Sequence, residues 1–214
     1  MSPGRLVTIE GIEGAGKSSA ARWVLEWLQR RAVSAHLTRE PGGTELAEQV
    51  RRIVLERGSE SISATAETLL MFAARAIHLD NLIRPALARG DWVVCDRFTD
   101  ATRAYQGAGR GVDGAWIEQL AARVHGELEP ACTLLLDLPV AMGLARAKSR
   151  RAGASDRFEA ETSVFFERVR TGYLELARRE PHRIRLIDAA ASLEDVQRQI
   201  GAVLSQLIAA GGAA

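Results

Sequence analysis

The sequence predicts a single α/β domain in which a five-stranded parallel sheet is flanked by helices. Short runs of β-branched and other apolar residues alternate along the 214 residues with longer stretches of helical periodicity, which is typical of a parallel sheet. The chain shows no internal repeat and no linker long enough to separate two domains. Because 47% hydrophobic residues can fill one core of this size, we expect residues 1–214 to form one domain.

The expected elements follow one another in a regular order. Strands are expected at residues 6–9, 35–38, 92–95, 133–136 and 184–187, where short apolar runs occur. Helices are expected over residues 17–31, 44–56, 65–89, 116–126, 140–149, 160–179 and 193–210. Their apolar residues recur at helical spacing, as Ala21, Val24 and Leu28 do in the first of these helices.

Composition excludes several classes of protein. A net charge of +1 argues against a general nucleic-acid or membrane-surface binder, which presents a net basic face. No apolar run approaches the roughly 20 residues of a membrane helix, and residues 1–10 lack the pattern of a secretory signal. Cys95 and Cys132 lie in apolar, strand-like segments, so we expect reduced core cysteines. The sequence thus predicts a cytoplasmic protein without nucleic-acid or membrane partners.

Residues 11–18 match the phosphate-loop pattern G-x-x-x-x-G-K-[ST] at every fixed position, between the first expected strand and the first expected helix. The glycines let backbone N–H groups turn toward phosphate oxygens, and the following helix adds its positive end. Lys17, one of only two lysines among 28 basic residues, would reach the β- and γ-phosphates. The Ser18 hydroxyl would bind Mg²⁺. The residues expected to hold the nucleoside triphosphate here are Gly11, Ile12, Glu13, Gly14, Ala15, Gly16, Lys17, Ser18 and Ser19.

Other residues, above all those that follow the third expected strand, limit the kinds of phosphate-loop protein this can be. A GTPase would need an N-K-x-D segment, but Asn81 is the only Asn and Leu82 follows it. Asp96 and Arg97 follow the strand 92–95 directly. Asp96 can serve Mg²⁺ through its water shell, and Arg97 would offer a planar fork to a second phosphate. An acid followed by arginine therefore indicates a kinase acting on an anionic small molecule.

Five motifs together resemble the bacterial thymidylate kinases. They are EGIEGAGK at 10–17, TREPGGT at 38–44, MFAAR at 71–75, DRF at 96–98 and AYQG at 104–107, in the family's order. The similarity runs from Leu6 to the final expected helix. It implies a phosphate-loop kinase fold and transfer of the γ-phosphoryl group of ATP to dTMP, giving dTDP and ADP for dTTP biosynthesis. It also implies Mg²⁺ and a homodimer packed through helices.

The resemblance assigns a binding site for the thymine base. Phe72 is expected to stack on the ring and Arg75 to donate to its O4 atom. Phe72 and Arg75 are three residues apart, whereas many relatives space this pair by four, so Met71 is the alternative stacking residue. Thr102 and Gln106, four residues apart, are expected at the base edge.

The same resemblance assigns the sugar and the acceptor phosphate. Tyr105 is expected against the sugar, where it disfavours a 2′-hydroxyl, and Glu13 is expected to accept a hydrogen bond from the 3′-hydroxyl. The acceptor phosphate carries about −1.5 to −2 charges near neutral pH and needs no strong general base. Its binding is assigned to Arg39, Arg51 and Arg97, which would align it and screen its repulsion from ATP.

Residues 146–158 are expected to form an arginine-rich mobile lid that closes over the phosphates and excludes water. Its basic residues are Arg146, Lys148, Arg150, Arg151 and Arg157. The variable positions of the phosphate loop hold no basic residue, so the family resemblance assigns the charge-stabilising arginine to the lid. Arg150 is the first candidate and Arg151 the alternative. Arg146 is expected against adenine, with the turn 188–190. The expected catalytic residues are thus Glu13, Lys17, Arg97 and Arg150.

Two other functions stay open on the sequence. A related kinase of a small molecule, such as a deoxynucleoside kinase, would carry the same loop with less need for acceptor-phosphate arginines. An ATP-driven switch would hydrolyse ATP slowly and respond to a protein partner, with no response to nucleotides. If the chain is a kinase of the thymidylate kinase type, its residues do not show whether dTMP is preferred over dUMP as the acceptor.

Overall fold

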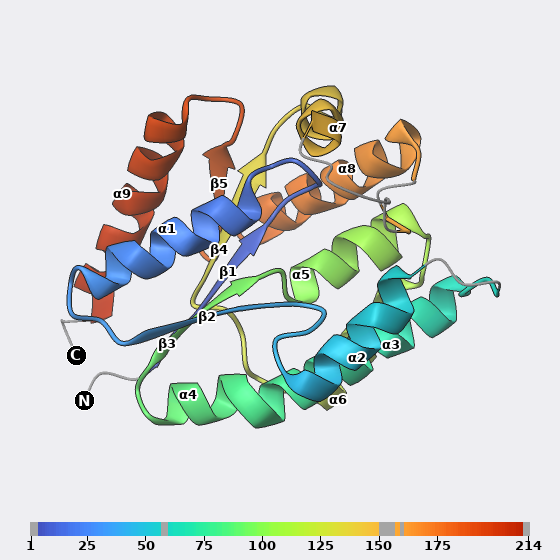
Figure 1. Ribbon diagram of the computed structural model, residues 1–214, viewed down its shortest axis with the longest axis horizontal. Coiled ribbons are helices and arrows are strands. Elements are labelled where there is room, and N and C mark those ends of the chain that lie inside the picture. Colours follow the sequence, from blue (N-terminus) through green and yellow to red (C-terminus); the bar gives the residue numbers. More distant parts are fainter. Residues whose placement is uncertain (1–3, 57–59, 150–156, 159–160, 212–214) are drawn as a thin grey trace.

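Five parallel strands form the centre of the molecule, in the order β2–β3–β1–β4–β5 (Figure 1). The computed structural model describes residues 4–56, 60–149, 157–158 and 161–211. The strands are β1 (Leu6–Glu10), β2 (Ala35–Arg39), β3 (Trp92–Asp96), β4 (Cys132–Asp137) and β5 (Ile184–Asp188). The predicted sheet is confirmed, and each strand is one or two residues longer than expected.

The central strands are buried on both faces. All five residues of β1 are buried, as expected for a strand of a parallel sheet that is covered by helices on both sides. Cys95 in β3 and Cys132 in β4 are buried and free, as predicted. The switch point of the sheet lies at β1, because the chain order reverses between β3 on one side and β4 on the other. Ligands of open α/β sheets bind at the carboxyl ends of the strands beside such a point.

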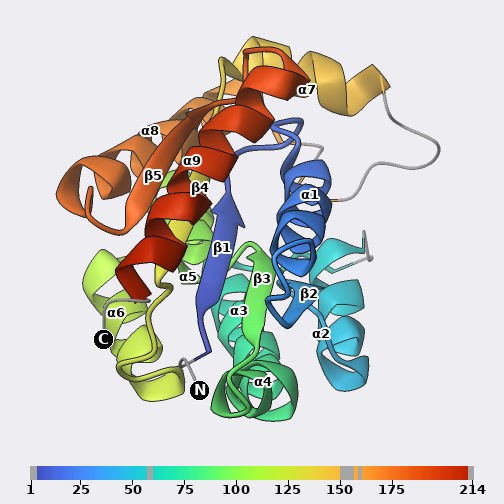
Figure 2. The same cartoon turned by 90° about the vertical axis from the view of Figure 1, so that its left-hand side faces the viewer.

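Helices cover both faces of the sheet (Figures 1 and 2). On one face α1 (Lys17–Gln29) packs on β1, β2 and β3 and contacts α9 (Leu193–Gly211), which packs on β5. On the other face α8 (Ser163–Arg179) packs on β4 and β5. The remaining helices include α2 (Glu45–Leu55), α6 (Gly114–Val124) and α7 (Val140–Ser149). None of the described helices is both long enough and apolar enough to cross a membrane.

The long helix expected over 65–89 contains a π-helical segment. It consists of α3 (Ala64–His78), the π-helical η1 (Leu79–Ile83) and α4 (Arg84–Ala88). Pro85 explains the interruption, because proline has no N–H and its ring clashes with the carbonyl group four residues earlier. The wider π-turn directly before Pro85 accommodates that lost hydrogen bond.

A second helical segment follows β3, where the sequence analysis assigned no element. It consists of α5 (Thr99–Thr102) and the π-helical η2 (Arg103–Gly109). Its glycines disfavour a helix in isolation, so local propensity did not reveal it. Packing stabilises it instead: η2 lies against α8, and a side chain on Gly109 would meet the Phe165 ring at 2.6 Å. This segment carries Thr102, Tyr105 and Gln106 toward the edge of the sheet.

Candidate active site

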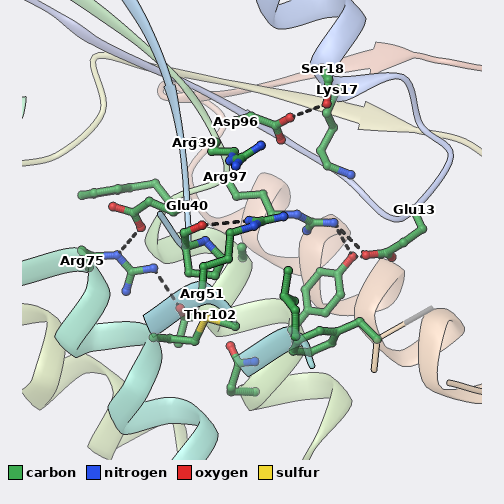
Figure 3. A pocket seen from close by; sticks show the side chains of 18 of the residues that line it. Glu13, Lys17, Ser18, Arg39, Glu40, Arg51, Arg75, Asp96, Arg97 and Thr102 are labelled. Carbon is green, nitrogen blue, oxygen red and sulfur yellow. Dashed lines mark hydrogen bonds and ion pairs between the residues drawn. The ribbon is translucent and has the colours of Figure 1, made fainter. Parts of the chain in front are cut away.

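A cavity of about 410 Å³ opens beside the carboxyl ends of β1 and β3. Figure 3 shows Lys17, Ser18 and Asp96 at one end of it, Arg75 and Thr102 at the other, and Arg97 between them. Most of the predicted site residues line this one cavity: Glu13, Gly14, Gly16, Lys17, Ser18, Arg39, Arg51, Arg75, Asp96, Arg97, Thr102, Tyr105 and Gln106. Gly11, Ile12, Ala15 and Ser19 belong to the same loop but are not among the lining residues.

The phosphate loop connects β1 to α1, as predicted. The Lys17 ammonium group lies across the loop and donates to the Ile12 carbonyl oxygen at 2.8 Å. Burial, followed by the nearby Arg97 charge, lowers the pKa of Lys17 to about 8. The loop also packs closely on α7, because a side chain on Gly14 would overlap the carbonyl group of Gly143. Glycine is therefore required at Gly14 both for this contact and for its φ of 77°.

The pairing of β1 with β3 brings together two oxygen groups that could hold a metal ion. Ile9 pairs with Asp96, so the end of β3 lies beside the start of the loop. The Ser18 hydroxyl donates to the Asp96 carboxylate at 2.8 Å. A hydroxyl and a carboxylate are the hard oxygen ligands that Mg²⁺ takes, with phosphate oxygens and water completing its shell. Among the described residues, no group of three or more His, Cys, Asp and Glu side chains could hold a metal alone.

Arg97 joins the phosphate loop to η2 and α8. Its Nη2 atom donates to Glu13 Oε1 and to the Tyr105 hydroxyl, each at 2.9 Å. The Tyr105 hydroxyl donates to Glu13 Oε2 at 2.6 Å, which closes a three-membered cluster. Nη1 of Arg97 donates to the Tyr173 hydroxyl at 3.3 Å. The residue adopts a φ of 74°, a conformation that a non-glycine residue rarely adopts outside functional sites.

Glu10, at the end of β1, holds the residues next to Arg97 in place. It was not predicted as a site residue from the sequence. Its carboxylate accepts hydrogen bonds from the Phe98 N–H at 2.7 Å and from the Tyr173 hydroxyl at 2.6 Å. Burial, then the negative charge of Asp100, raises the pKa of Glu10 to about 7, and the Arg97 charge opposes this shift. An acid at the end of a mostly apolar strand was the sequence signal. Glu10 therefore holds both the backbone after Arg97 and the tyrosine beside it.

Arg75 is fixed at the opposite end by buried partners. Its Nε donates to Glu40 at 2.7 Å and its Nη2 donates to the Thr102 hydroxyl at 3.1 Å. Glu40, which the sequence analysis did not identify as a site residue, also contacts His78 Nδ1 at 3.1 Å, and His78 Nε2 lies 2.7 Å from the Thr38 hydroxyl. Nη1 of Arg75 is buried and has no hydrogen-bond partner within the described residues. Arg75, which lines the cavity, thus keeps one buried donor that no described residue satisfies.

The structure places Met71, and not Phe72, in the wall of the cavity. Phe72 is 3% exposed and packs with Ile117 and Ala121 of α6. The Arg75 guanidinium lies 4.9 Å from the Phe72 ring centre, so the two residues share a helix face as the spacing predicts. This placement corrects the expectation that Phe72 meets the base, because its ring fills a hydrophobic cluster outside the cavity.

Two further arginines line the cavity from β2 and α2. The side chain of Arg39 pairs with Glu48 at 3.0 Å and is half-exposed. Arg51 donates to the Pro41 carbonyl oxygen at 2.8 Å. Together with Arg97 they surround the middle of the cavity with positive charge, as expected for an anion site.

The residues at the ends of the expected lid lie apart from each other. Arg146 in α7 donates to the Ala189 carbonyl oxygen at 2.7 Å, which confirms that it adjoins the turn after β5. Arg157 is not on the donor side, which corrects our expectation: it donates to the buried Glu67 at 2.5 Å and to the Val54 carbonyl oxygen at 3.0 Å. A buried carboxylate holds it at the acceptor end. Arg150 and Arg151 lie outside the described residues.

Comparisons with known proteins identify one family. The sequence model of the family described as thymidylate kinase matches residues 9–200. A thymidylate kinase of Pseudomonas syringae pv. syringae is 54% identical over 205 residues, covering 96% of this chain and 97% of that protein. One from Alkalilimnicola ehrlichii is 51% identical over 208 residues, covering 97% and 95%.

A solved structure shows the same fold. The crystal structure of thymidylate kinase from Ehrlichia chaffeensis superposes with a TM-score of 0.77 at 31% identity, covering 94% of this chain and 100% of that chain. The match of sequence and fold extends over nearly the full length in each case. The chain therefore belongs to the thymidylate kinase family.

Proposed function

We propose that this chain transfers the γ-phosphoryl group of ATP to dTMP in a single in-line step, giving dTDP and ADP. The observation that carries the proposal is the position of Arg97. It lies between the phosphate loop and the base end of one cavity, and it contacts Glu13 of that loop at 2.9 Å. A donor phosphate on the loop and an acceptor phosphate on Arg97 would therefore meet without an intermediate carrier.

The acceptor phosphate is itself the nucleophile, so the enzyme has to align two anions and screen their repulsion. Arg39, Arg51 and Arg97 supply the positive charge around it. Glu13 would accept a hydrogen bond from the 3′-hydroxyl, and Tyr105, held on Glu13 at 2.6 Å, would close the sugar site against a 2′-hydroxyl.

The base would occupy the end of the cavity at α3 and η2. Nη1 of Arg75 is the buried donor that would meet the O4 atom of thymine. Thr102 and Gln106 lie at the edge of the same space, and Met71 forms its apolar wall. The thioether of Met71 replaces the flat ring that the family resemblance assigned to Phe72.

On the donor side, the loop backbone and Lys17 would bind the triphosphate. Ser18 and Asp96 would hold Mg²⁺, which when bound neutralises charge on the phosphate oxygens. Arg146 and the turn at Ala189 would bind adenine. The family resemblance assigns the arginine that stabilises the transition state to the lid, because the variable positions of the phosphate loop hold no basic side chain. Arg150 is our candidate and Arg151 the alternative.

A coupled assay of ADP formation tests this function. We expect turnover with dTMP and at most background turnover with thymidine or buffer, because only dTMP brings a phosphate to Arg97. A comparison with dUMP measures selectivity for the 5-methyl group. Turnover with thymidine alone would indicate a nucleoside kinase, and ATP hydrolysis that does not respond to nucleotides would indicate a switch.

In the same assay, Arg97→Met should lower kcat/KM for dTMP by on the order of 10²–10³-fold. Arg84→Met, on the exposed surface of α4, is the control and should leave kcat/KM unchanged.

A matched pair of variants tests the base site. Met71→Ala should raise KM for dTMP about tenfold without loss of stability, because it removes the wall of the cavity but little of the core. Phe72→Ala should lower the free energy of unfolding by about 3–5 kcal/mol, because it empties a buried position. Steady-state kinetics and urea unfolding measure the two effects. A KM effect confined to Phe72→Ala would return the stacking role to that residue.

We also propose that the chain forms a homodimer through α2 and α3, which pack side by side. Leu46 and Ile53, seven residues apart on α2, are 54% and 57% exposed, and Leu69 on α3 is 47% exposed. Large apolar side chains that gather on adjacent helices are typical of an interface.

Sedimentation equilibrium tests the dimer. Ile53→Glu should convert the dimer to a monomer, because it places a charge in the apolar contact. Val164→Glu is the control, because Val164 is more exposed but lies on α8. A monomeric wild-type protein, or a dimer insensitive to Ile53→Glu, would contradict this interface.

A further inference from the structure

Glu67 is a fully buried carboxylate that belongs to none of the five motifs and has no role in the proposed reaction. It lies in α3 and accepts hydrogen bonds from three residues that are distant in sequence. Gln106 Nε2 donates to Oε1 at 2.7 Å, and Arg157 Nη2 donates to Oε2 at 2.5 Å. Arg110 Nε also lies 3.4 Å from Oε1. One acid thus holds the end of the predicted base site, η2 and the chain after residue 156.

The chemistry of Glu67 determines how the Gln106 amide is turned. An ionised carboxylate only accepts hydrogen bonds, whereas an amide group can donate through its nitrogen or accept through its oxygen. The guanidinium groups of Arg110 and Arg157 both pair with Glu67 as donors. The Gln106 nitrogen must therefore face Glu67, which leaves the carbonyl oxygen Oε1 for the cavity that Gln106 lines.

Arg75 is oriented by a second carboxylate in the same way. Glu40 accepts from its Nε, so that the buried Nη1 is the donor left without a partner among the described residues. Arg75 and Gln106 both line this end of the cavity, so a base bound there would meet the unpaired donor of Arg75 and the acceptor of Gln106. A pyrimidine with a carbonyl at C4 and a proton on N3 matches both groups. Cytosine matches neither, because its N3 accepts and its 4-amino group donates.

We propose that Glu67 is a specificity-determining positioning residue: by orienting the Gln106 amide, it makes the site accept a 4-oxo pyrimidine and reject a 4-amino one. This inference rests on the proposed function, because it assumes that the base lies against Arg75 and Gln106. A site that hydrogen-bonds one arrangement of donors and acceptors rejects the reverse arrangement strongly, because buried polar groups would stay unpaired.

The test compares kcat/KM for dTMP with kcat/KM for dCMP in Glu67→Gln. A glutamine at this position can donate, so the Gln106 amide can turn and offer its N–H group to N3 of cytosine. We expect the dTMP-to-dCMP ratio to fall by about tenfold or more, while kcat for dTMP changes less than threefold. Glu161→Gln is the matched control, because Glu161 binds the same Arg110 at 2.6 Å without contacting Gln106. Its ratio should stay at the wild-type value.

Glu67→Asp keeps a carboxylate and provides the second variant if Glu67→Gln does not fold, as judged by thermal unfolding. We expect Glu67→Asp to retain the wild-type ratio within about threefold, since it still only accepts. An unchanged ratio in folded Glu67→Gln, or a tenfold loss in Glu67→Asp or Glu161→Gln, overturns the role of Glu67. The base site is tested separately by Gln106→Ala: if its KM for dTMP is unchanged, the base assignment is wrong, and if KM rises, that assignment holds whatever Glu67 does.

Discussion

The parallel pairing of β1 with β3 is the constraint on which the site depends. Both strands end at the same edge of the sheet, and the pairing of Ile9 with Asp96 sets their register. A shift of one residue would turn each side chain of β3 to the other face of the sheet. In the register observed, Ser18 meets Asp96 and Glu13 meets Arg97, so that the residues we assign to the donor and to the acceptor line one cavity. The hydrophobic residues of both strands hold this register from within the core.

Buried carboxylates then orient side chains that line the cavity. Glu40 holds Arg75, and Glu67 holds Gln106. Glu10 acts on Arg97 through Tyr173. Burying a charge is unfavourable unless it is paired, so each acid is retained with hydrogen-bonding partners that it also immobilises. A net charge of +1 conceals this arrangement, because the arginines of the cavity are balanced by acids behind them. Preorganised groups of this kind need little rearrangement when charge develops during phosphoryl transfer.

The features that could be predicted from the sequence are those that depend on residues close together in the chain. The phosphate loop, the strand ending in Asp96 and Arg97, and the order of strands and helices each depend on adjacent residues. Contacts between residues far apart in the sequence could not be predicted: Glu10 and Tyr173 are 163 residues apart, and Glu67 and Arg157 are 90 apart. Phe72 and Met71 show a different limit, because adjacent positions on a helix point in different directions and only packing against α6 separates them. The η2 segment was missed because tertiary contacts, rather than propensity, make it helical.

Direct transfer between the two ends of the cavity is the central claim, and stereochemistry at phosphorus tests it most directly. ATP made chiral at the γ-phosphorus with oxygen isotopes would be incubated with the enzyme and dTMP, and the configuration of the transferred phosphoryl group in dTDP determined. A single in-line displacement, with the acceptor held by Arg97 opposite the phosphate loop, predicts inversion of configuration. Retention would require two displacements through a phosphorylated side chain and would contradict the account.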